Sequence, residues 1–325
     1  MDQELNRYIL MNEGKGLVPG YPQSMLDVMG KTNIAAVHGS AHKFIRGSLL
    51  SLVGTAAIKD QLFPDIDKFM RIILNNWDGK TIGFQEKANE MAFYVAFRQI
   101  IIAECDLIYE AFDKAATAAL SLPINIPGKS YYQGLQTRKN IHKILRQIVE
   151  ERKASRKTHN DMFAELIGNE KSRYRLTEEQ VFNQIFTILY SGYETVSVTT
   201  MMAIKYLHDH PKALQELKDS SFQKDGEYMF SQGSSTMIQS SIQSLLATFN
   251  PWRWLDKCLE SHSYCFLFGA GGGLCPGKEL GMVKVSTFLH YYVTKYRWEE
   301  VEEVEIIKFP RVEVPNGLHV RVSKH

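Results

Sequence analysis

Apolar residues recur at helical spacing along much of the chain. Between residues 135 and 153 the positions i, i+3, i+4, i+7 and i+8 are apolar, which predicts an amphipathic helix; they are Ile141, Ile144, Leu145, Ile148 and Val149. A run of basic residues, with Glu150 and Glu151 among them, covers residues 138–157, and we expect it to be a solvated helix face. Its members are Arg138, Lys139, Lys143, Arg146, Arg152, Lys153, Arg156 and Lys157.

A longer helix is expected from Thr177 to the residue before Pro211. Thr177 is a good N-cap, and Gln180 three residues later completes a capping box. About 30 residues at 1.5 Å each give roughly 45 Å, enough to cross a domain. Apolar side chains cover much of the circumference, so we expect this helix to be buried. They include Val181, Ile185, Phe186, Ile188 and Leu189.

Strand-like alternation is confined to the C-terminal tail. Val312 and Val314 precede the turn sequence 315–317, Pro-Asn-Gly, and alternation resumes at Leu318. This pattern predicts a hairpin, so the fold class is mainly α with a minor β component. Residues 219–248 are rich in serine and glutamine, lack periodicity, and are expected to form an atypical linker or insert.

Bulk composition narrows the classes of function. The chain has 325 residues, 44% hydrophobic and 23% charged, which is typical of a globular protein. A net charge of +2 gives no reason to expect a nucleic-acid partner. The four cysteines show no pairing pattern, which indicates a reducing compartment, and we find neither a signal peptide nor a transmembrane anchor. As written, the chain is expected to be soluble.

The most informative segment is residues 268–277, Phe-Gly-Ala-Gly-Gly-Gly-Leu-Cys-Pro-Gly, followed by an apolar-periodic helix. The glycines allow a tight turn, Pro276 suits the first helical position, and the helix N-terminus favours a thiolate at Cys275. Such a thiolate can act as a nucleophile or bind a soft metal.

Three other interpretations of this segment stay open on the residues alone. Residues 272–278 match a phosphate-binding loop until Glu279 takes the magnesium-ligand position. A zinc site could be assembled from Cys258, His262, Cys265 and Cys275, although the Cys-x-x-Cys spacing is missing. Cys275 could also be an inert cysteine beside a glycine-rich turn.

Two further motifs carry chemistry. Gly192, Glu194 and Thr195 lie in the middle of the long helix, where a glycine costs about 1 kcal/mol relative to alanine and opens room for a flat ligand. The alternative is close helix packing with a solvated Glu194. His42 and Arg46, spaced i, i+4, could clamp a carboxylate, or could belong to an ordinary basic face.

Taken together, these motifs resemble the cytochrome P-450 monooxygenases, whose loop has the pattern Phe-x-x-Gly-x-x-x-Cys-x-Gly. The resemblance implies haem b with Cys275 as the axial ligand of the iron and Phe268, Gly271 and Gly277 shaping the loop. It also implies that His42 and Arg46 hold a haem propionate. Gly192 would admit oxygen and substrate, while Thr195 and Glu194 deliver protons.

Segments 189–197, 201–216, 249–257 and 308–322 resemble plant brassinosteroid C-6 oxidases. The resemblance implies oxidation of a steroid, electrons from NADPH through a separate NADPH–cytochrome P-450 reductase, and a location at the endoplasmic reticulum membrane. The segment 249–254, with Arg253, matches a family segment whose arginine locks the core.

The chain departs from the family pattern in three places. We expect it to begin where the family is already well into its domain, without the membrane anchor, hinge and first strands. The Ser/Gln-rich stretch replaces the Glu-x-x-Arg helix and sheet segment, and the pair Glu170 and Arg173 precedes the long helix and cannot serve. Gly273 stands where an arginine is expected.

We therefore expect residues 1–325 to form a single, incomplete haem-thiolate monooxygenase domain with a partial cytochrome P-450 fold. The alternative is a non-catalytic, truncated remnant that at most binds haem or a protein partner.

Overall fold

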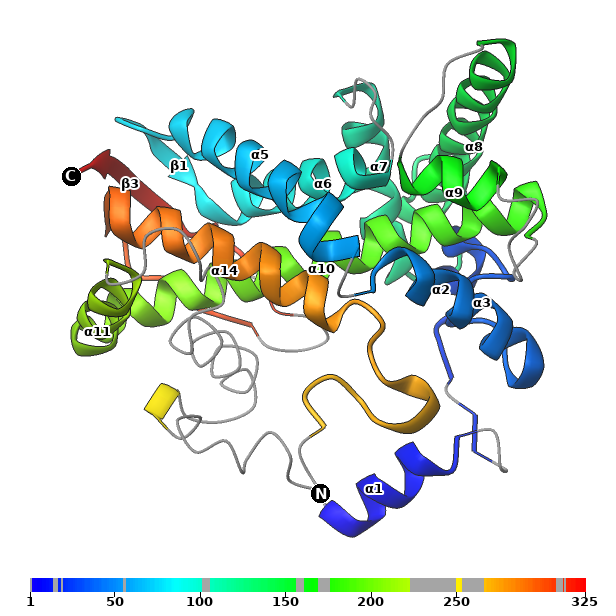
Figure 1. Ribbon diagram of the computed structural model, residues 1–325, viewed down its shortest axis with the longest axis horizontal. Coiled ribbons are helices and arrows are strands. Elements are labelled where there is room, and N and C mark those ends of the chain that lie inside the picture. The colour runs from blue at the N-terminus through cyan, green and yellow to red at the C-terminus, as the bar shows by residue number, and fades with distance from the viewer. Residues whose placement is uncertain are drawn as a thin grey trace. The chain divides into compact units, whose positions relative to one another are not determined.

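The computed structural model describes residues 2–13, 17, 18, 20–54, 57–100, 106–155, 161–168, 176–222, 250–252, 266–307, 312 and 314–325. The chain divides into two compact units, each built from several segments. The first unit comprises Met1–Met11, Thr55–Val95 and Gly192–His325, and the second comprises Asn12–Gly54 and Ala96–Ser191. Helices α6 (Phe84–Ile100) and α10 (Glu178–Asp209) each contribute to both units (Figure 1).

The second unit is helical. Besides parts of α6 and α10, it contains α2 (Gln23–Met29), α3 (Gly39–Leu52), α7 (Asp106–Ala119), α8 (Ser130–Ala154) and α9 (Met162–Gly168). Helices α7 and α8 pack closely because Gly134 of α8 faces Ala118 of α7. A Cβ added at Gly134 would lie 2.2 Å from the Cβ of Ala118.

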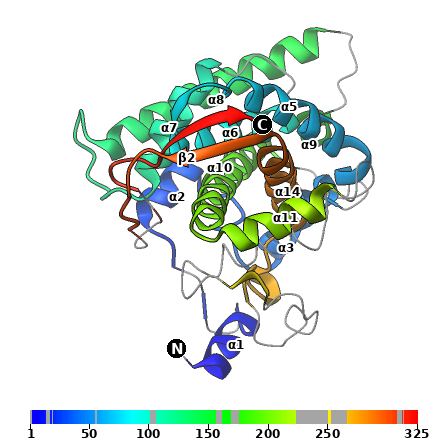
Figure 2. The ribbon, with the colours of Figure 1, turned by 90° about the vertical axis from the view of Figure 1, so that its left-hand side faces the viewer.

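The first unit carries the small sheet. Its helices are α1 (Gln3–Met11), the π-helix η1 (Ile58–Leu62), α5 (Phe63–Asn75), α11 (Pro211–Phe222) and α14 (Lys278–Lys295), with the 3-10 turn η3 (Gly271–Gly273). Helix α14 packs against α5 and α11 (Figure 2). An aromatic cluster anchors its C-terminal half, where Tyr292 contacts Phe84, Phe288 and Trp298.

The predicted hairpin is wrong. Strand β3 (His319–Lys324) lies between β1 (Thr81–Gly83) and β2 (Tyr296–Glu300), antiparallel to both, with Val320 opposite Ile82 and Val322 opposite Trp298. Both edges of β3 are therefore paired, which leaves no edge for residues 312 and 314. The predicted turn does form, since Gly317 has φ +75° and its N–H donates to the carbonyl of Val314.

Both predicted helices are confirmed. Helix α8 includes residues 135–153, with Ile141, Leu145 and Val149 buried. Helix α10 begins after the capping box, in which Thr177 and Gln180 exchange hydrogen bonds of 2.9 and 3.3 Å, and it ends just before His210. Together with the three-stranded sheet, they make the described fold mainly α with a minor β component.

Two parts of the basic run are not solvated as expected. Arg138 donates to the carbonyl of Val28 at 2.9 Å and to Asn183 Oδ1 at 2.6 Å. Arg152 makes a bidentate pair with Asp161, at 2.8 and 2.6 Å, while its side chain is only 13% exposed. Both guanidinium groups are held by partners outside α8, which the charge pattern of the helix itself does not predict.

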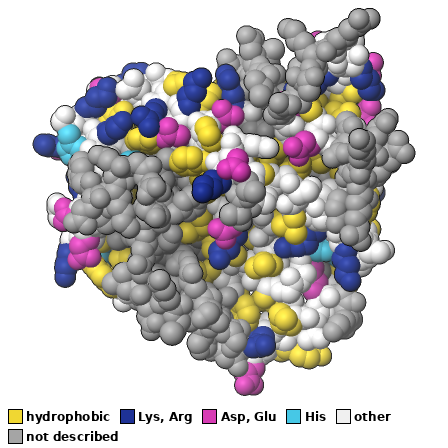
Figure 3. Space-filling model, viewed as in Figure 1, with side chains coloured by type: hydrophobic (Ala, Val, Ile, Leu, Met, Phe, Trp, Pro, Cys, Tyr) yellow, Lys and Arg dark blue, Asp and Glu magenta, His cyan; other side chains and the backbone are white. Residues whose placement is uncertain are grey.

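Helix α11 extends through Phe222 and so takes up residues 219–222, the first four of the expected linker. Residues 223–248 lie outside the described residues. Charged side chains of both signs are scattered over the face in Figure 3, in keeping with the small net charge. Among the described helices, none combines the length and apolar character needed to span a membrane.

His142 makes the second unit sensitive to acid. Burial, together with the smaller effect of the neighbouring charges of Arg138 and Arg146, lowers the pKa of this side chain to about 4. Its Nε2 is buried without a hydrogen-bond partner among the described residues, and the ring lies edge-on to Phe182. The folded state therefore disfavours the proton that an unfolded histidine takes up near pH 6.5.

We predict that unfolding free energy, measured with urea, falls as the pH drops from about 6.5 toward 4. The stabilisation is fully present above the unfolded pKa and is lost as the pH falls through the folded value. His142→Phe should flatten this slope. If the variant loses stability as steeply as the parent over that range, His142 is not the source.

Two glycine-to-alanine substitutions, one at the contact between α7 and α8 and one at an open position of α14, should have opposite effects on stability. Gly134→Ala should destabilise the protein by about 1–3 kcal/mol, because the new methyl collides with Ala118. Gly281→Ala on α14 meets nothing within 4 Å and should stabilise by up to about 1 kcal/mol through helix propensity. Equal urea midpoints for the two variants would contradict this packing.

Candidate functional site

A cavity of about 510 Å³ lies within the first unit, between α10, the loop before α14 and the first turns of α14. Its walls are mostly apolar. The lining residues are Glu194, Thr195, Val196, Val198 and Thr199 from α10; Leu267, Phe268, Gly269, Gly273, Cys275 and Gly277 from the loop; Gly281, Met282 and Val285 from α14; and Val312. Cavities of this size and character hold small molecules or cofactors.

The loop that carries Cys275 is held by its own main chain. The N–H of Cys275 donates to the carbonyl of Phe268 at 2.7 Å, and the N–H of Gly269 donates to the carbonyl of Phe266 at 2.9 Å. These bonds close the loop on itself and fix the backbone at the cysteine. Cys275 is a free thiol, exposed, and its residue forms part of the cavity wall.

Glycine is required in this loop for two physical reasons. Gly269 and Gly271 have φ of +78° and +57°, a region that side chains disfavour. A Cβ at Gly269 would lie 2.7 Å from the carbonyl oxygen of Gly273, and one at Gly271 would lie 2.8 Å from the carbonyl oxygen of Leu10. Gly271 therefore admits the close approach of α1 but does not itself line the cavity.

The expectation that Pro276 takes the first helical position is wrong. Helix α14 begins at Lys278 with Gly277 as its N-cap, and its first hydrogen bond joins the N–H of Gly281 to the carbonyl of Gly277 at 2.8 Å. Pro276 lies instead in the turn that leads from Cys275 into the helix. Phe268 lies beside this start, with Lys278 Nζ 5.4 Å from the centre of its ring.

Helix α10 supplies the wall across from this loop and runs uninterrupted through residues 192–195. Glu194 and Thr195 line the cavity, whereas Gly192 does not. Sequence reasoning missed Val198 and Thr199, although each lies four residues after a predicted site residue and so shares its helix face. It also missed Met282 and Val285, which line the cavity and share a face of α14 at i, i+3 spacing.

His42 and Arg46 belong to the second unit, on one face of α3, and both side chains are half-buried. Burial lowers the pKa of His42, Arg46 and His38 lower it further, and Glu13 raises it. The role of His42 and Arg46 as a carboxylate clamp stays a prediction. Arg253, Cys258, His262, Cys265 and the pair Glu170 and Arg173 lie outside the described residues.

Comparison with known proteins places this geometry in a family. The family model described as cytochrome P-450 matches residues 101–222 and 247–318, more than half of the chain. The chain therefore belongs to the cytochrome P-450 family, and it is an oxidoreductase of the monooxygenase class.

Similar relatives are plant proteins. Cytochrome P-450 85A1 of Solanum lycopersicum is 46% identical, the alignment covering 100% of this chain and 82% of the relative. Cytochrome P-450 85A of Phaseolus vulgaris is also 46% identical, over 99% of this chain and 82% of the relative. Among solved structures, the retinoic acid bound cyanobacterial CYP120A1 shares the fold, with a TM-score of 0.87 at 16% identity over 99% of this chain and 88% of that one.

Family membership replaces the phosphate-loop and zinc interpretations of the cysteine loop. The comparison also shows that this chain differs from the family within its own sequence. The family model leaves residues 223–246 unmatched, and the alignment with the Solanum relative spans 383 positions against the 325 residues of this chain. The relative thus carries about 58 residues within the aligned region that have no counterpart here.

Membership of the family implies a haem cofactor, and the cavity fits one in part. A free, exposed cysteine, a loop with glycines in place of side chains, and mostly apolar walls suit a flat iron porphyrin held by a thiolate. The carboxylates at the edge of such a group have fewer suitable partners in this cavity. The described residues that line the cavity include no arginine or lysine, and Gly273 adds no side chain.

The loop geometry predicts the effect of one substitution. Gly269→Ala should lower haem incorporation at least several-fold, because the added methyl collides with the carbonyl of Gly273 at a positive φ and shifts Cys275. The ratio of haem absorbance to protein absorbance measures the loss. Gly20→Ala, at an open position without a positive φ, is the control and should retain the parent ratio. Equal ratios in both variants would contradict this account of the loop.

Proposed function

We propose that this chain is a haem-thiolate monooxygenase that oxidises a plant steroid at ring carbon 6, in the manner of brassinosteroid C-6 oxidation. The observation that supports the proposal most is the pairing of Cys275 and Thr195 across one mostly apolar cavity. A cysteine that can ligate a metal and a threonine hydroxyl that can pass on a proton are the two groups that the proposed chemistry uses.

The proposal assigns a role to each wall of the cavity. Cys275 would hold the haem iron through its sulfur, with Phe268, Gly271 and Gly277 keeping the loop in shape. When bound, haem supplies oxygen activation, and a thiolate ligand favours cleavage of the O–O bond. The chain's own contribution is to exclude water with residues such as Val198, Met282 and Val285.

Proton supply is the second assigned role. Thr195 and Glu194 face the cavity from α10, and we assign to them the delivery of protons toward the oxygen-binding side. Thr199, one turn further on, extends the same polar track along the helix. Gly192 lies three residues before Thr195 but does not line the cavity, so its role in admitting oxygen and substrate stays a prediction.

The identity of the substrate rests on the similarity to the plant 85A proteins and on the mostly apolar walls of the cavity. A steroid is large, rigid and mostly apolar, so apolar walls stabilise it by about 25 cal/mol for each Å² of apolar surface removed from water. Electrons would come from NADPH through a separate reductase at the endoplasmic reticulum membrane. His42 and Arg46 remain our candidates for the propionate contact.

A second candidate function is favoured by two observations. Gly273 provides no cation at the cavity, and residues 223–246 match no part of the family model. A chain that lost these contacts would be a non-catalytic remnant that at most binds haem or a protein partner.

Turnover separates the two candidates. The haem-loaded chain is mixed with a plant cytochrome P-450 reductase, NADPH and a brassinosteroid precursor that lacks oxygen at carbon 6, and products are followed by mass spectrometry. We expect a product that has gained oxygen at that carbon. Haem-loaded protein that accepts electrons but yields no oxidised steroid would overturn the steroid assignment and favour the remnant.

A matched pair of threonine variants tests the proton route. Thr195→Ala should lower the product formed per NADPH consumed by roughly tenfold or more, since proton transfer by a positioned side chain contributes about 10²–10⁴-fold. Thr294→Ala is the control, because its hydroxyl bonds to the carbonyl of His290 on α14 and is not part of the cavity wall. If the two variants couple equally well, Thr195 has no part in proton delivery.

A further inference from the structure

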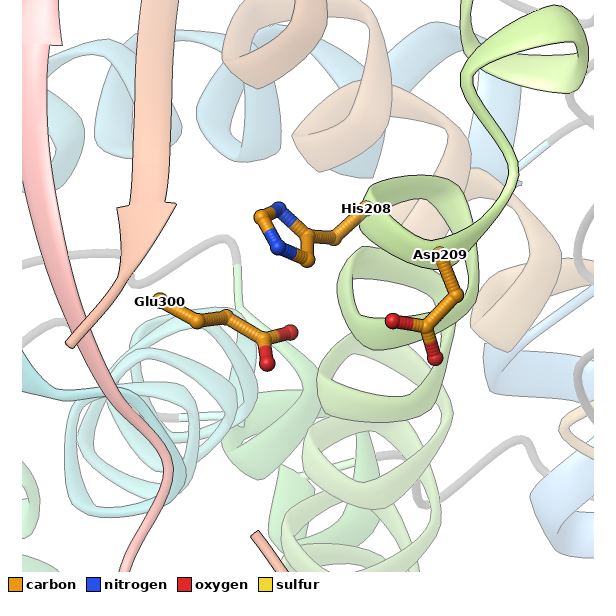
Figure 4. Close-up of side chains that lie close together, drawn as sticks. All are labelled: His208, Asp209 and Glu300. Carbon is orange, nitrogen blue, oxygen red and sulfur yellow. The ribbon is translucent and has the colours of Figure 1, made fainter. Parts of the chain in front are cut away.

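A second cluster of ligand-type side chains lies within the first unit, where α10 ends beside the end of β2. His208 and Asp209 occupy the last turn of α10, and Glu300 is the last residue of β2. One ligand atom from each lies within 4.8 Å of the others, and the three side chains converge in Figure 4. None of the three lines the cavity beside Cys275.

The burial and hydrogen bonding of Glu300 indicate that a ligand is missing from the cluster. Its side chain is only 9% exposed, and its Oε2 accepts from Lys205 Nζ at 3.1 Å. Its Oε1 is fully buried and finds no hydrogen-bond partner in the described part of the chain. A buried carboxylate oxygen left unpaired costs more than 1–3 kcal/mol, roughly, so a missing partner is expected. Figure 4 shows this carboxylate directed toward His208 and Asp209.

Charge counting indicates the kind of partner. Lys205 Nζ also lies 2.7 Å from Asp209 Oδ1, so one ammonium serves two carboxylates and leaves one negative charge uncompensated. A cation is therefore the partner that the remaining charge favours.

The ligand set narrows the choice of cation. An imidazole nitrogen with two carboxylate oxygens suits a divalent transition metal, whereas magnesium and calcium prefer oxygen alone. Around a tetrahedral zinc ion with bonds of about 2.0–2.1 Å, ligand atoms lie roughly 3.3–3.5 Å apart. Ligand atoms that lie within 4.8 Å of one another must close by at most about 1.4 Å, which side-chain rotation at the exposed Asp209 can supply.

We propose that His208, Asp209 and Glu300 form a zinc site, with water as the fourth ligand, that ties the end of α10 to β2. The ion gives Glu300 Oε1 the partner that it lacks. Asp209, with its side chain 39% exposed, gives the ion a path from solvent. Because α10 also forms a cavity wall, such a tie would fix the helix that carries Thr195.

The test uses the full chain, loaded with haem and freed of zinc by a chelator. Zinc is titrated in by calorimetry, and zinc-edge X-ray absorption reports the ligands, since zinc–nitrogen and zinc–oxygen bonds are near 2.0–2.2 Å and zinc–sulfur bonds near 2.3 Å. We expect one zinc per chain with nitrogen and oxygen ligands only. A sulfur shell, which Cys275 or another thiol would give, overturns the proposal, as does the absence of binding.

Variants locate the ion. His208→Ala should weaken zinc binding at least tenfold, while His319→Ala, the matched control from the exposed His319–Glu302 pair, should leave it unchanged. Lys205→Met removes the competing ammonium and should tighten binding several-fold. Circular dichroism confirms that each variant is folded. Unchanged affinity in His208→Ala, or no gain in Lys205→Met, refutes the assignment.

Discussion

The hydrogen bond from the Cys275 N–H to the carbonyl of Phe268, 2.7 Å long, closes the loop on which the cavity depends. It can form because Gly269 and Gly271 adopt positive φ and because no side chain intervenes between Gly269 and the carbonyl of Gly273. The same closure leaves the cysteine exposed at the cavity instead of buried against the helix. Substituted glycines would open the loop and move Cys275, the thiol that we propose as the ligand of the iron.

Helix α10 supplies the second constraint. Its capping box fixes where it begins, and its 32 residues pass from the second unit into the first. Along that length it presents a buried apolar surface around Phe186, then the polar face of Thr195 and Thr199 at the cavity. Near its C-terminal end, the side chain of Lys205 forms ion pairs with Asp209 and with Glu300 of β2. One element thus serves packing, the candidate site and the attachment to the sheet.

Local signals in the sequence predicted much of this. The limits of α10 were predicted within a residue or two from Thr177, Gln180 and Pro211. The glycines before Cys275 predicted a tight loop. The alternation at Leu318, Val320 and Val322 predicted β3, but the other two strands were missed, because β1 has only three residues, too few to show a period, and because β2 follows α14 without a turn. The alternation of buried Tyr296 and Trp298 was the available signal there.

Long-range partners account for the remaining errors. Arg138 is predicted to be solvated when only its own helix is considered, yet it donates hydrogen bonds to Asn183 and to the carbonyl of Val28. The approach of Leu10 to Gly271 joins residues at opposite ends of the sequence. No local period encodes such contacts, so Val312 and Leu267 in the cavity wall could not be named beforehand.

The claim at the centre of this account is that Cys275 holds a haem iron as its thiolate. The reduced, carbon-monoxide-bound difference spectrum of the haem-loaded chain tests it most directly, with Cys275→Ser recorded in parallel. We predict the strongly red-shifted band of a thiolate-ligated haem in the parent chain and its loss in Cys275→Ser. A folded parent chain that binds haem without that band, or a serine variant that keeps it, would contradict the account.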